Sequence, residues 1–410
     1  MVVIVGGGLA GLACAIHLER AGVDWMLYEG SLRPGGRVAT DVTADGFRLD
    51  RGFQVLLDSY RTARELLDFK ALKPCYFQSG ALLANDRGWE RILNPLVHPN
   101  WIGMAPFTES FTTSEKMKLG CFLVSQLLHL SEASSNKELG FTSMEELRRW
   151  GLDRGALEKF LRPFFAGVFL DNELAADASI LHDKLRRFLL GRALLPAGGM
   201  GEIPMQLAAS LPSERQFYGS EVTSLRLADD RISALQLASG KLVPCDSLVL
   251  ATDEFTTRRL LSLPDGRNWS SVSTFYFTGE KPLYEGALLV LPEGASLRVR
   301  HFTDLTNTAP DYAPPGRRLL SATVLGNPDD EVLGQVQSEI VSLLPEFESW
   351  TFLKRVTVNR ALPSQIPGFS PQKLPSHPLR NLWLAGDQCS AVSIDSALAS
   401  GWKAAAELLQ

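Results

Sequence analysis

An α/β fold with a parallel sheet at its centre is the class that this sequence predicts, and three observations support it. The apolar run 2–5 has the character of a buried strand, and Gly6, Gly8 and Gly11 follow it with the spacing G-x-G-x-x-G. An apolar-periodic helix comes next and leads into a second strand that ends at Glu29. Near the C-terminus, another apolar strand is again followed by a helix.

Each glycine of the first turn has its own task in binding a dinucleotide. Gly6 lets the chain turn sharply, Gly8 lets the backbone approach a pyrophosphate, and Gly11 lets the helix pack on the strand. The helix N-terminus offers free N–H groups and a positive dipole end to the phosphates. Glu29 is placed to accept hydrogen bonds from ribose hydroxyls. We therefore predict a dinucleotide site here; the alternative is an ordinary glycine-rich turn.

A glycine pair and an arginine, Gly35-Gly36-Arg37, follow the predicted ribose acid. The pair suits a second approach to the pyrophosphate, with Arg37 paired to a phosphate or near an isoalloxazine ring; a solvated surface arginine is the alternative. At this point the chain resembles the flavin-containing amine oxidoreductase superfamily, which includes amine oxidases, protoporphyrinogen oxidases and carotenoid desaturases. The resemblance implies a discontinuous Rossmann-type FAD-binding domain with a mixed α+β substrate domain, as in p-hydroxybenzoate hydroxylase and amine oxidases.

The resemblance also suggests how the chain is divided. The FAD-binding domain is expected to combine 1–60, 195–264 and 376–410. A helical part of the substrate domain would cover 61–194, and a strand-rich part 265–375. No second G-x-G-x-x-G follows a strand, so a separate NAD(P)H domain is not expected.

Hydrophobic periodicity predicts the elements between these motifs. Ser143 and Glu146 have the spacing of a capping box at the start of one helix. The expected helices cover 59–69, 114–130, 143–150, 153–165 and 330–344, and the expected strands cover 225–227, 232–237, 246–252, 272–277 and 287–291.

The segment 45–54 resembles the family segment that runs beside the flavin ring. Gly52 would permit close backbone approach to the ring, and Gln54 could face it. A plain hairpin is the alternative, because Asp45-Gly46 is a common turn.

Two further segments match the family pattern. The segment 195–204 resembles the P-x-G-G-M loop, which the resemblance makes a wall near the flavin. Val222 would present its backbone amide and carbonyl to the adenine. Ala251 ends a buried strand near the adenosine half of FAD.

The segment 381–387 and the helix after it resemble the closing flavin motif. Asp387 would bind ribityl hydroxyls or lie near the pyrophosphate. The helix N-terminus at Ser393-Ile394 would point at flavin N1 and O2, where it would stabilise the negative charge of the reduced ring. The predicted cofactor-binding residues are Gly6, Gly8, Leu9, Ala10, Gly11, Glu29, Gly30, Gly36, Arg37, Gly52, Phe53, Gln54, Val222, Ala251, Gly386, Asp387, Ser393 and Ile394.

The last motif departs from the family pattern. Ser396-Ala397 stands where members usually have Gly-Ala, and Asp395 precedes it. A carboxylate near the flavin pyrimidine would oppose the anionic reduced form, unless it points into solvent or caps the helix. The spacing of Cys389 from the motif does not suit a covalent flavin link, so noncovalent FAD is expected.

Composition describes an ordinary globular protein. The 410 residues are 45% hydrophobic and 21% charged, and the net charge of −5 gives no electrostatic reason to expect nucleic acid. The five cysteines are far apart, without C-x-x-C, and suggest neither a disulfide framework nor a metal site. The chain begins directly with a strand, so no signal peptide is expected and a cytoplasmic location is predicted.

The most apolar segment, 119–130, is shorter than the roughly 18 residues that a membrane-spanning helix needs. A buried helix is one interpretation. The other is a patch that makes peripheral membrane contact to collect a lipophilic substrate.

The segment 162–169 resembles one in protoporphyrinogen oxidases and desaturases where a helix ends near the substrate cavity. Core packing is the alternative role for its aromatic side chains. The candidate substrate-binding residues are Phe164, Phe165, Phe169 and Met200.

The sequence therefore predicts an FAD-dependent oxidase or dehydrogenase that passes electrons to oxygen or a quinone. It would act on a C–C or C–N bond of a lipophilic substrate, with a small amine as the alternative. A second alternative is a binding protein without redox chemistry, like the Rab GDP-dissociation inhibitors, although their glycine motifs are degraded. The six histidines are scattered, and no general base is assigned.

Overall fold

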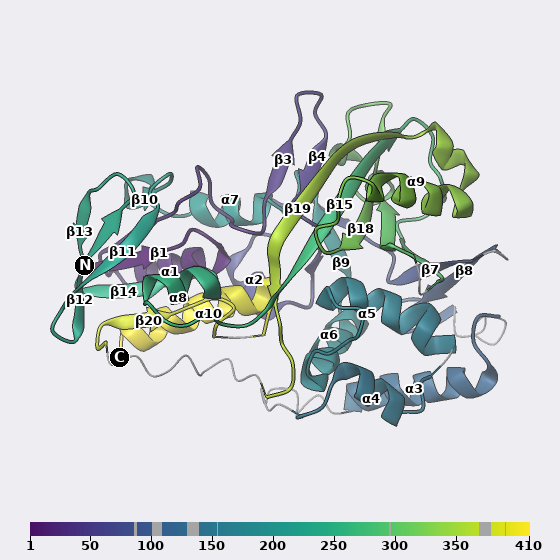
Figure 1. The fold of residues 1–410 in the computed structure, drawn as a ribbon, viewed down its shortest axis with the longest axis horizontal. Coiled ribbons are helices and arrows are strands. Elements are labelled where there is room, and N and C mark those ends of the chain that lie inside the picture. Colours follow the sequence, from purple (N-terminus) through teal and green to yellow (C-terminus); the bar gives the residue numbers. More distant parts are fainter. Residues whose placement is uncertain are drawn as a thin grey trace.

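The structure is a computed structural model with two large sheets and a group of helices (Figure 1). Residues from all three parts line one cavity. One sheet is parallel and contains the strands that precede the first glycine turn and the C-terminal motif. The described residues are 1–85, 88–100, 109–128, 139–153, 155–294, 297–368, 379–389 and 391–410.

The parallel sheet has five strands in the order β10-β2-β1-β14-β20. The run β1 (Val2–Val5) pairs with β2 (Trp25–Tyr28) on one edge and with β14 (Ser247–Leu250) on the other. All four of its side chains are buried, as is typical of a central strand in a parallel sheet that is covered on both faces. The outer strands are β10 (Gln216–Phe217) and β20 (Leu382–Leu384). Segments from both ends and the middle of the chain thus form one α/β unit, as the predicted fold class requires.

Two helices from opposite ends of the chain pack together beside this sheet (Figure 1). They are α1 (Leu9–Arg20) and α10 (Ile394–Leu408). A Cβ on Gly401 would lie 2.7 Å from the carbonyl carbon of Ala10 and closer still to its oxygen. The glycine therefore allows the two backbones to come into contact.

The second sheet has seven strands in the order β19-β15-β18-β17-β16-β7-β8, and all neighbours are antiparallel except β16 and β7. Side chains alternate across each strand, so Phe302 packs in the core beneath α9 (Val332–Leu343), whereas His301 points to the opposite face and lines the cavity. The strands are β19 (Thr351–Pro363), β15 (Trp269–Gly279), β18 (Arg318–Leu325), β17 (Val299–Asp304), β16 (Leu289–Pro292), β7 (Gly80–Asn85) and β8 (Gly88–Leu93).

A helical layer lies below this sheet in Figure 1. Residues of this layer line part of the cavity. It contains α3 (Thr113–Leu128), α4 (Ser143–Arg149), α5 (Arg162–Phe169) and α6 (Ala178–Leu190). A π-helical turn, Leu157–Leu161, precedes α5, where one continuous helix was expected. Residue 154 and the expected helical end at 129–130 lie outside the described residues.

The capping box of α4 differs from the prediction by one residue. Thr142 is the N-cap, and its side chain accepts from the backbone N–H of Glu145, whose carboxylate in turn accepts from Thr142. Ser143 instead donates its hydroxyl to the carbonyl of Ala176. The sequence Thr142-Ser143-Met144-Glu145-Glu146 allows either register, and the tertiary contact of Ser143 decides between them.

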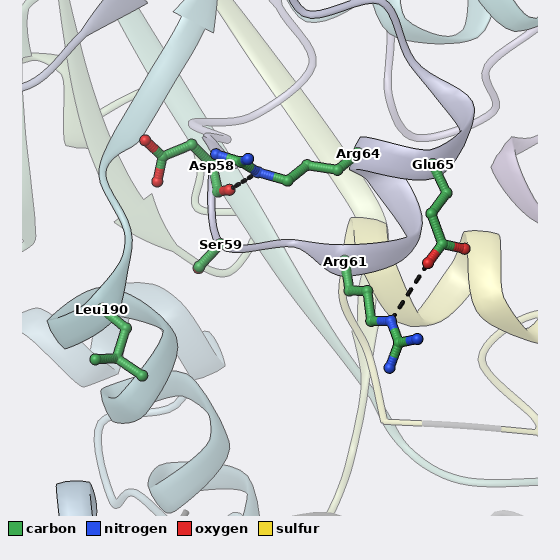
Figure 2. A pocket seen from close by; sticks show the side chains of 6 residues that line it. All are labelled: Asp58, Ser59, Arg61, Arg64, Glu65 and Leu190. Atoms are coloured by element: carbon green, nitrogen blue, oxygen red, sulfur yellow. Dashed lines mark hydrogen bonds and ion pairs between the residues drawn. The ribbon is translucent and has the colours of Figure 1, made fainter.

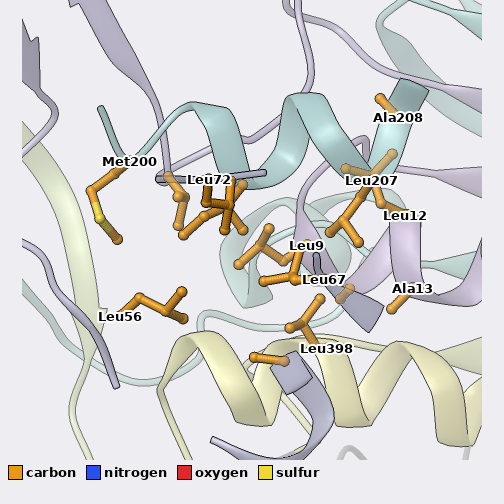
Figure 3. Close-up of a cluster of buried hydrophobic side chains, with 14 of the residues drawn as sticks. Leu9, Leu12, Ala13, Leu56, Leu67, Leu72, Met200, Leu207, Ala208 and Leu398 are labelled. Atoms are coloured by element: carbon orange, nitrogen blue, oxygen red, sulfur yellow. The ribbon is translucent and has the colours of Figure 1, made fainter. Parts of the chain in front are cut away.

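A cluster of buried apolar side chains joins α1 and α10 to several of the smaller elements (Figure 3). Within the described residues, no helix is both long and apolar enough to cross a membrane. The remaining elements are α2 (Arg61–Leu66), α7 (Glu202–Ala209), α8 (Glu254–Leu260), β3 (Thr40–Val42), β4 (Arg48–Asp50), β5 (Leu56–Leu57), β6 (Pro74–Tyr76), β9 (Ala193–Pro196), β11 (Val222–Ala228), β12 (Arg231–Leu237) and β13 (Leu242–Pro244).

Candidate functional site

One cavity of about 1420 Å³ extends from the first glycine turn to the helical layer. Every predicted cofactor residue except Gly11 lines it, although these residues are spread over nearly 400 positions of sequence. Those that line it are Gly6, Gly8, Leu9, Ala10, Glu29, Gly30, Gly36, Arg37, Gly52, Phe53, Gln54, Val222, Ala251, Gly386, Asp387, Ser393 and Ile394.

The three glycines of the first turn have different surroundings. Gly6 has φ +110°, a conformation that L side chains rarely adopt. A Cβ on Gly11 would overlap the carbonyl group of Gly6, with only 3.1 Å to its carbon. A Cβ on Gly8 would meet no described atom within 4 Å, because it would point into the cavity. The turn therefore leaves an open place beside the N-terminus of α1.

Glu29 stands at the end of β2 and ties the glycine turn to the segment after it. One carboxylate oxygen accepts from the backbone N–H of Gly7 at 2.6 Å. The other accepts from the N–H of Ser31 at 2.7 Å and from its hydroxyl. A carboxylate has about four lone-pair sites, so one remains for a ligand hydroxyl. Glu29 thus has a structural role that the sequence did not reveal.

Arg37 and Asp387 form an ion pair across 350 positions of sequence, with 2.6 Å between Nη2 and Oδ2. Arg37 also donates to the carbonyl of Ala361 at 3.0 Å and lies 5.6 Å from the ring centre of Trp269. The side chain of Asp387 is only 3% exposed, and its Oδ1 has no hydrogen-bond partner among the described residues. A buried carboxylate oxygen without a partner is costly, so this atom suits a ligand hydroxyl.

The segment predicted to run beside a ring forms the β3–β4 hairpin and then turns into the cavity at Gly52, which has φ +89°. The hairpin is therefore present, and Gly52, Phe53 and Gln54 after it line the cavity. The amide group of Gln54 donates to the carbonyls of Arg37 and Arg51. Its Oε1 is buried without a partner in the described part of the chain.

The N-terminus of α10 faces the same cavity. Ser393 caps the helix by accepting from the N–H of Ser396 at 3.0 Å. Asp395 neither points into solvent nor caps its own helix: it accepts from the N–H of Ala63 and pairs with Arg187, both at 3.1 Å. The charge that departs from the family pattern is thereby neutralised within the protein.

Three of the four candidate substrate residues line the cavity. Phe164 and Phe165 on α5 contact each other edge to face at 5.2 Å, and Phe169 stacks on Phe165 at 5.4 Å. Met200 is the exception and corrects the prediction: it is fully buried in the core cluster and is not among the lining residues (Figure 3). Its backbone N–H donates to Asp50, which turns the glycine-rich loop inward.

Sequence reasoning missed His301. This residue lines the cavity, lies 4.9 Å from the ring centre of Phe53, and has no hydrogen-bond partner for either ring nitrogen among the described residues. Burial lowers the pKa of His301 to about 3, so the imidazole is neutral at physiological pH. A lone histidine in an alternating strand has no signal that reveals a cavity on one of its two sides.

A second hollow, on the surface beside α2, is shallow and lined largely by charged side chains (Figure 2). Arg61 and Glu65 pair across one helical turn at 3.3 Å, and both are exposed. Asp58 is engaged by Arg192. These contacts satisfy the charges within the protein, so the large cavity remains the candidate site.

Comparison with known proteins agrees with this geometry. The family model described as flavin containing amine oxidoreductase matches residues 9–409. Coproporphyrinogen III oxidase of Bacillus subtilis is 23% identical over 400 residues, which cover 84% of this chain and 81% of that protein. The 15-cis-phytoene desaturase of Synechococcus elongatus is 24% identical over 452 residues, which cover 98% and 94%.

A solved structure of putrescine oxidase bound to putrescine has the same fold, with a TM-score of 0.74, 18% identity, and coverage of 100% of this chain and 98% of that one. The fold class predicted from the sequence is confirmed, as is the resemblance on which the prediction rested. Because the family model matches nearly the whole chain, this protein belongs to the flavin containing amine oxidoreductase family and is a flavin-dependent oxidoreductase.

Proposed function

We propose that the cavity holds one noncovalently bound FAD and that the protein oxidises a C–C or C–N bond of a lipophilic small molecule. The observation that carries the proposal is the continuity of the cavity. The glycine turn predicted to bind a dinucleotide and a group of phenylalanines line the same cavity. A single ligand-binding space thus joins residues suited to a nucleotide with residues suited to an apolar substrate.

The residues present fit FAD. Gly8 leaves room for a pyrophosphate at the N-terminus of α1, where free N–H groups favour an anion. Glu29 has acceptor capacity left for a ribose hydroxyl, and Oδ1 of Asp387 lacks a partner of its own. When bound, the flavin supplies a hydride acceptor at N5.

The protein's own groups would prepare the flavin end of the site. The N-terminus of α10 presents its positive dipole end to the cavity, and the pairing of Asp395 with Arg187 prevents that carboxylate from opposing it. Burial raises the pKa of the Cys389 thiol to about 12, and Cys389 is not among the cavity-lining residues. Both facts support a noncovalent cofactor.

The domain division expected from the sequence fits this arrangement and belongs to the proposal. Segments 1–60, 195–264 and 376–410 would form the FAD-binding domain, and 61–194 with 265–375 the substrate domain. The parallel sheet draws all of its strands from the first set. The seven-stranded sheet and the helical layer draw theirs from the second.

An apolar substrate is favoured by the phenylalanine side chains that α5 and α6 place in the cavity wall, including Phe164, Phe165 and Phe188. Burying apolar surface contributes about 25 cal/mol per Å², so a large hydrophobic ligand can bind with few polar contacts. A small amine is the second candidate, favoured by the fold shared with putrescine oxidase.

Oxygen or a quinone would reoxidise the flavin in the cytoplasm or at a membrane surface. Peripheral membrane contact is supported by Met117, Val124 and Leu128, which are exposed on one side of α3. A helix with an exposed apolar stripe can lie in the interface of a bilayer.

Purified protein tests the proposal directly. We expect a yellow protein that releases FAD on acid denaturation and whose flavin is bleached anaerobically by apolar substrates from a panel of polyenes, porphyrinogens and amines. Bleaching by small amines alone would replace the lipophilic substrate with the amine alternative. A colourless protein that takes up no added FAD would support the binding role without redox chemistry.

A further inference from the structure

The charged side chains that line the cavity are distributed unevenly. The substrate half, formed by the helical layer and the seven-stranded sheet, has no aspartate or glutamate among its described lining residues. It does have two lysines on neighbouring helices, Lys116 on α3 and Lys184 on α6. The carboxylates that line the cavity all come from the expected FAD-binding segments: Glu29, Glu221, Asp253 and Asp387.

Lys116 lies on the inner face of α3. It shares that face with Leu119, Gly120 and Leu123, which follow at i+3, i+4 and i+7 and also line the cavity. The helix contacts α6, and Arg186 of α6 donates to the carbonyl of Gln126 at 3.2 Å. The α3 wall is therefore apolar apart from one cation.

Lys184 is the more deeply placed of the two lysines, with a side chain only 8% exposed. It lies one helical turn before Phe188, which packs on Phe164 at 5.1 Å. Among the described residues its ammonium has one acceptor, Oδ2 of Asp183 at 3.1 Å, although it carries three N–H donors. Two donors remain for a group in the cavity.

The counter-charge of Lys184 is shared with another cation. Asp183 also accepts from Arg187 at 2.8 Å, and Arg187 in turn pairs with Asp395 at 3.1 Å. Lys184 is thus the cavity end of a row of alternating charges. Burial lowers the pKa of Lys184, since a buried ammonium lacks the solvation that water would supply, and an anion beside it would restore that stabilisation.

We propose that the substrate half of the cavity binds an apolar molecule that carries an anionic group, and that Lys184 is the residue that contacts this group. The inference rests on the proposed function and narrows its substrate class. A carboxylate or phosphate would find the buried ammonium of Lys184 in a region of low dielectric, where charge-assisted bonds are strong. A protonated amine would find two lysines and no carboxylate among the described lining residues of that half, so cationic substrates are disfavoured.

Three ligands distinguish the contribution of the charge from that of the alkyl chain: dodecanoate, dodecanol and dodecylamine. They have the same chain length and differ in the charge of the head group. Each is titrated by calorimetry into the flavin-loaded protein at pH 7.5, below the critical micelle concentrations. Dodecanoate should bind at least tenfold more tightly than dodecanol, and dodecylamine should bind more weakly than either. Lys184→Met should remove the preference for the acid while leaving the affinity for dodecanol unchanged, and Lys184→Arg should preserve it.

Lys403→Met is the matched control, because Lys403 is exposed on α10 and pairs with Glu407. It should bind all three ligands as the unmodified protein does. Equal affinity for dodecanoate and dodecanol would refute the proposal that the substrate carries an anionic group, but not the apolar pocket. A preference that persists in Lys184→Met would overturn the role of Lys184. Binding of none of the three to yellow protein would reject the apolar pocket of the proposed function as well.

Discussion

Alanine substitutions at Gly8 and Gly11 should affect different properties of the protein, because the two glycines have different surroundings. Gly8 has φ −77° and ψ −178°, which any residue can adopt, and its Cβ would enter the cavity without meeting a described atom. Gly11 lies inside α1, where its Cβ would overlap the carbonyl group of Gly6. The first substitution should damage cofactor binding, and the second should damage the fold.

The magnitudes follow from these contacts. Gly8→Ala should leave the free energy of unfolding of the flavin-free protein within about 1 kcal/mol of the original, since glycine-to-alanine changes at compatible backbone angles stabilise by roughly 0.4–1 kcal/mol. The added methyl should remove at least one charge-assisted hydrogen bond to the pyrophosphate, worth about 1.5–3 kcal/mol, or roughly 10- to 150-fold in the FAD dissociation constant. Gly8→Val should purify without flavin.

Gly11→Ala gains about 1 kcal/mol of helix propensity, but its methyl must displace the Gly6 carbonyl group, and such overpacking costs about 1–3 kcal/mol or more. Urea unfolding of flavin-free protein and fluorescence titration with FAD measure the two quantities separately. The reasoning would be refuted if Gly8→Val bound FAD with unchanged affinity, or if Gly8→Ala destabilised the flavin-free protein as much as Gly11→Ala.

Three other predictions concern the fold and the site. Burial raises the pKa of Asp50 to about 6, so the folded protein retains a proton there that the unfolded chain releases at lower pH. The free energy of unfolding relative to that of Asp50→Asn should therefore fall by roughly 2–3 kcal/mol from pH 4 to 7, and a pH-independent difference in urea unfolding would contradict this. Gly401→Ala should lower stability by about 1–3 kcal/mol in thermal unfolding because its methyl would overlap the Ala10 carbonyl, whereas Gly334→Ala, with no described atom within 4 Å, should be neutral or slightly stabilising. Glu29→Gln should weaken FAD binding by about 1–3 kcal/mol in fluorescence titration without changing the rate of flavin reduction in saturated enzyme, and a slower reduction at unchanged affinity would argue against a ribose contact.

The sequence alone determined the fold class and identified most of the residues that line the cavity around the first glycine turn. These features depend on local patterns: an apolar strand, glycines at fixed spacing, and a helix that starts where the pattern changes. The helix predicted to start at Ser393 does have that residue as its N-cap, and the strand predicted at Val2–Val5 has those limits. These local patterns predict the elements correctly because residues close in sequence largely set the backbone conformation at these positions.

Only the tertiary structure decided the pairings between distant segments. Arg37 was expected to meet a phosphate or the flavin ring, and no local pattern indicated that it would also pair with Asp387. Asp395 was expected in solvent or at its own helix cap, yet Arg187 from α6 neutralises it. Local sequence patterns do not indicate which charged side chains become neighbours, because that depends on how sheets and helices pack.

The same limit applies to the substrate half of the cavity. Periodicity marks one side of a helix or strand as buried, but it cannot distinguish a side chain that faces a cavity from one that faces the core. Met200 was therefore assigned to the wall although it lies in the core, and Lys184 and His301 were overlooked although they line the cavity. The sequence identified the glycine turn at which we propose that a dinucleotide binds. The packing of α3, α5 and α6 against the seven-stranded sheet decided which side chains surround the other half of the cavity, because a cavity exists only between elements that have already come together.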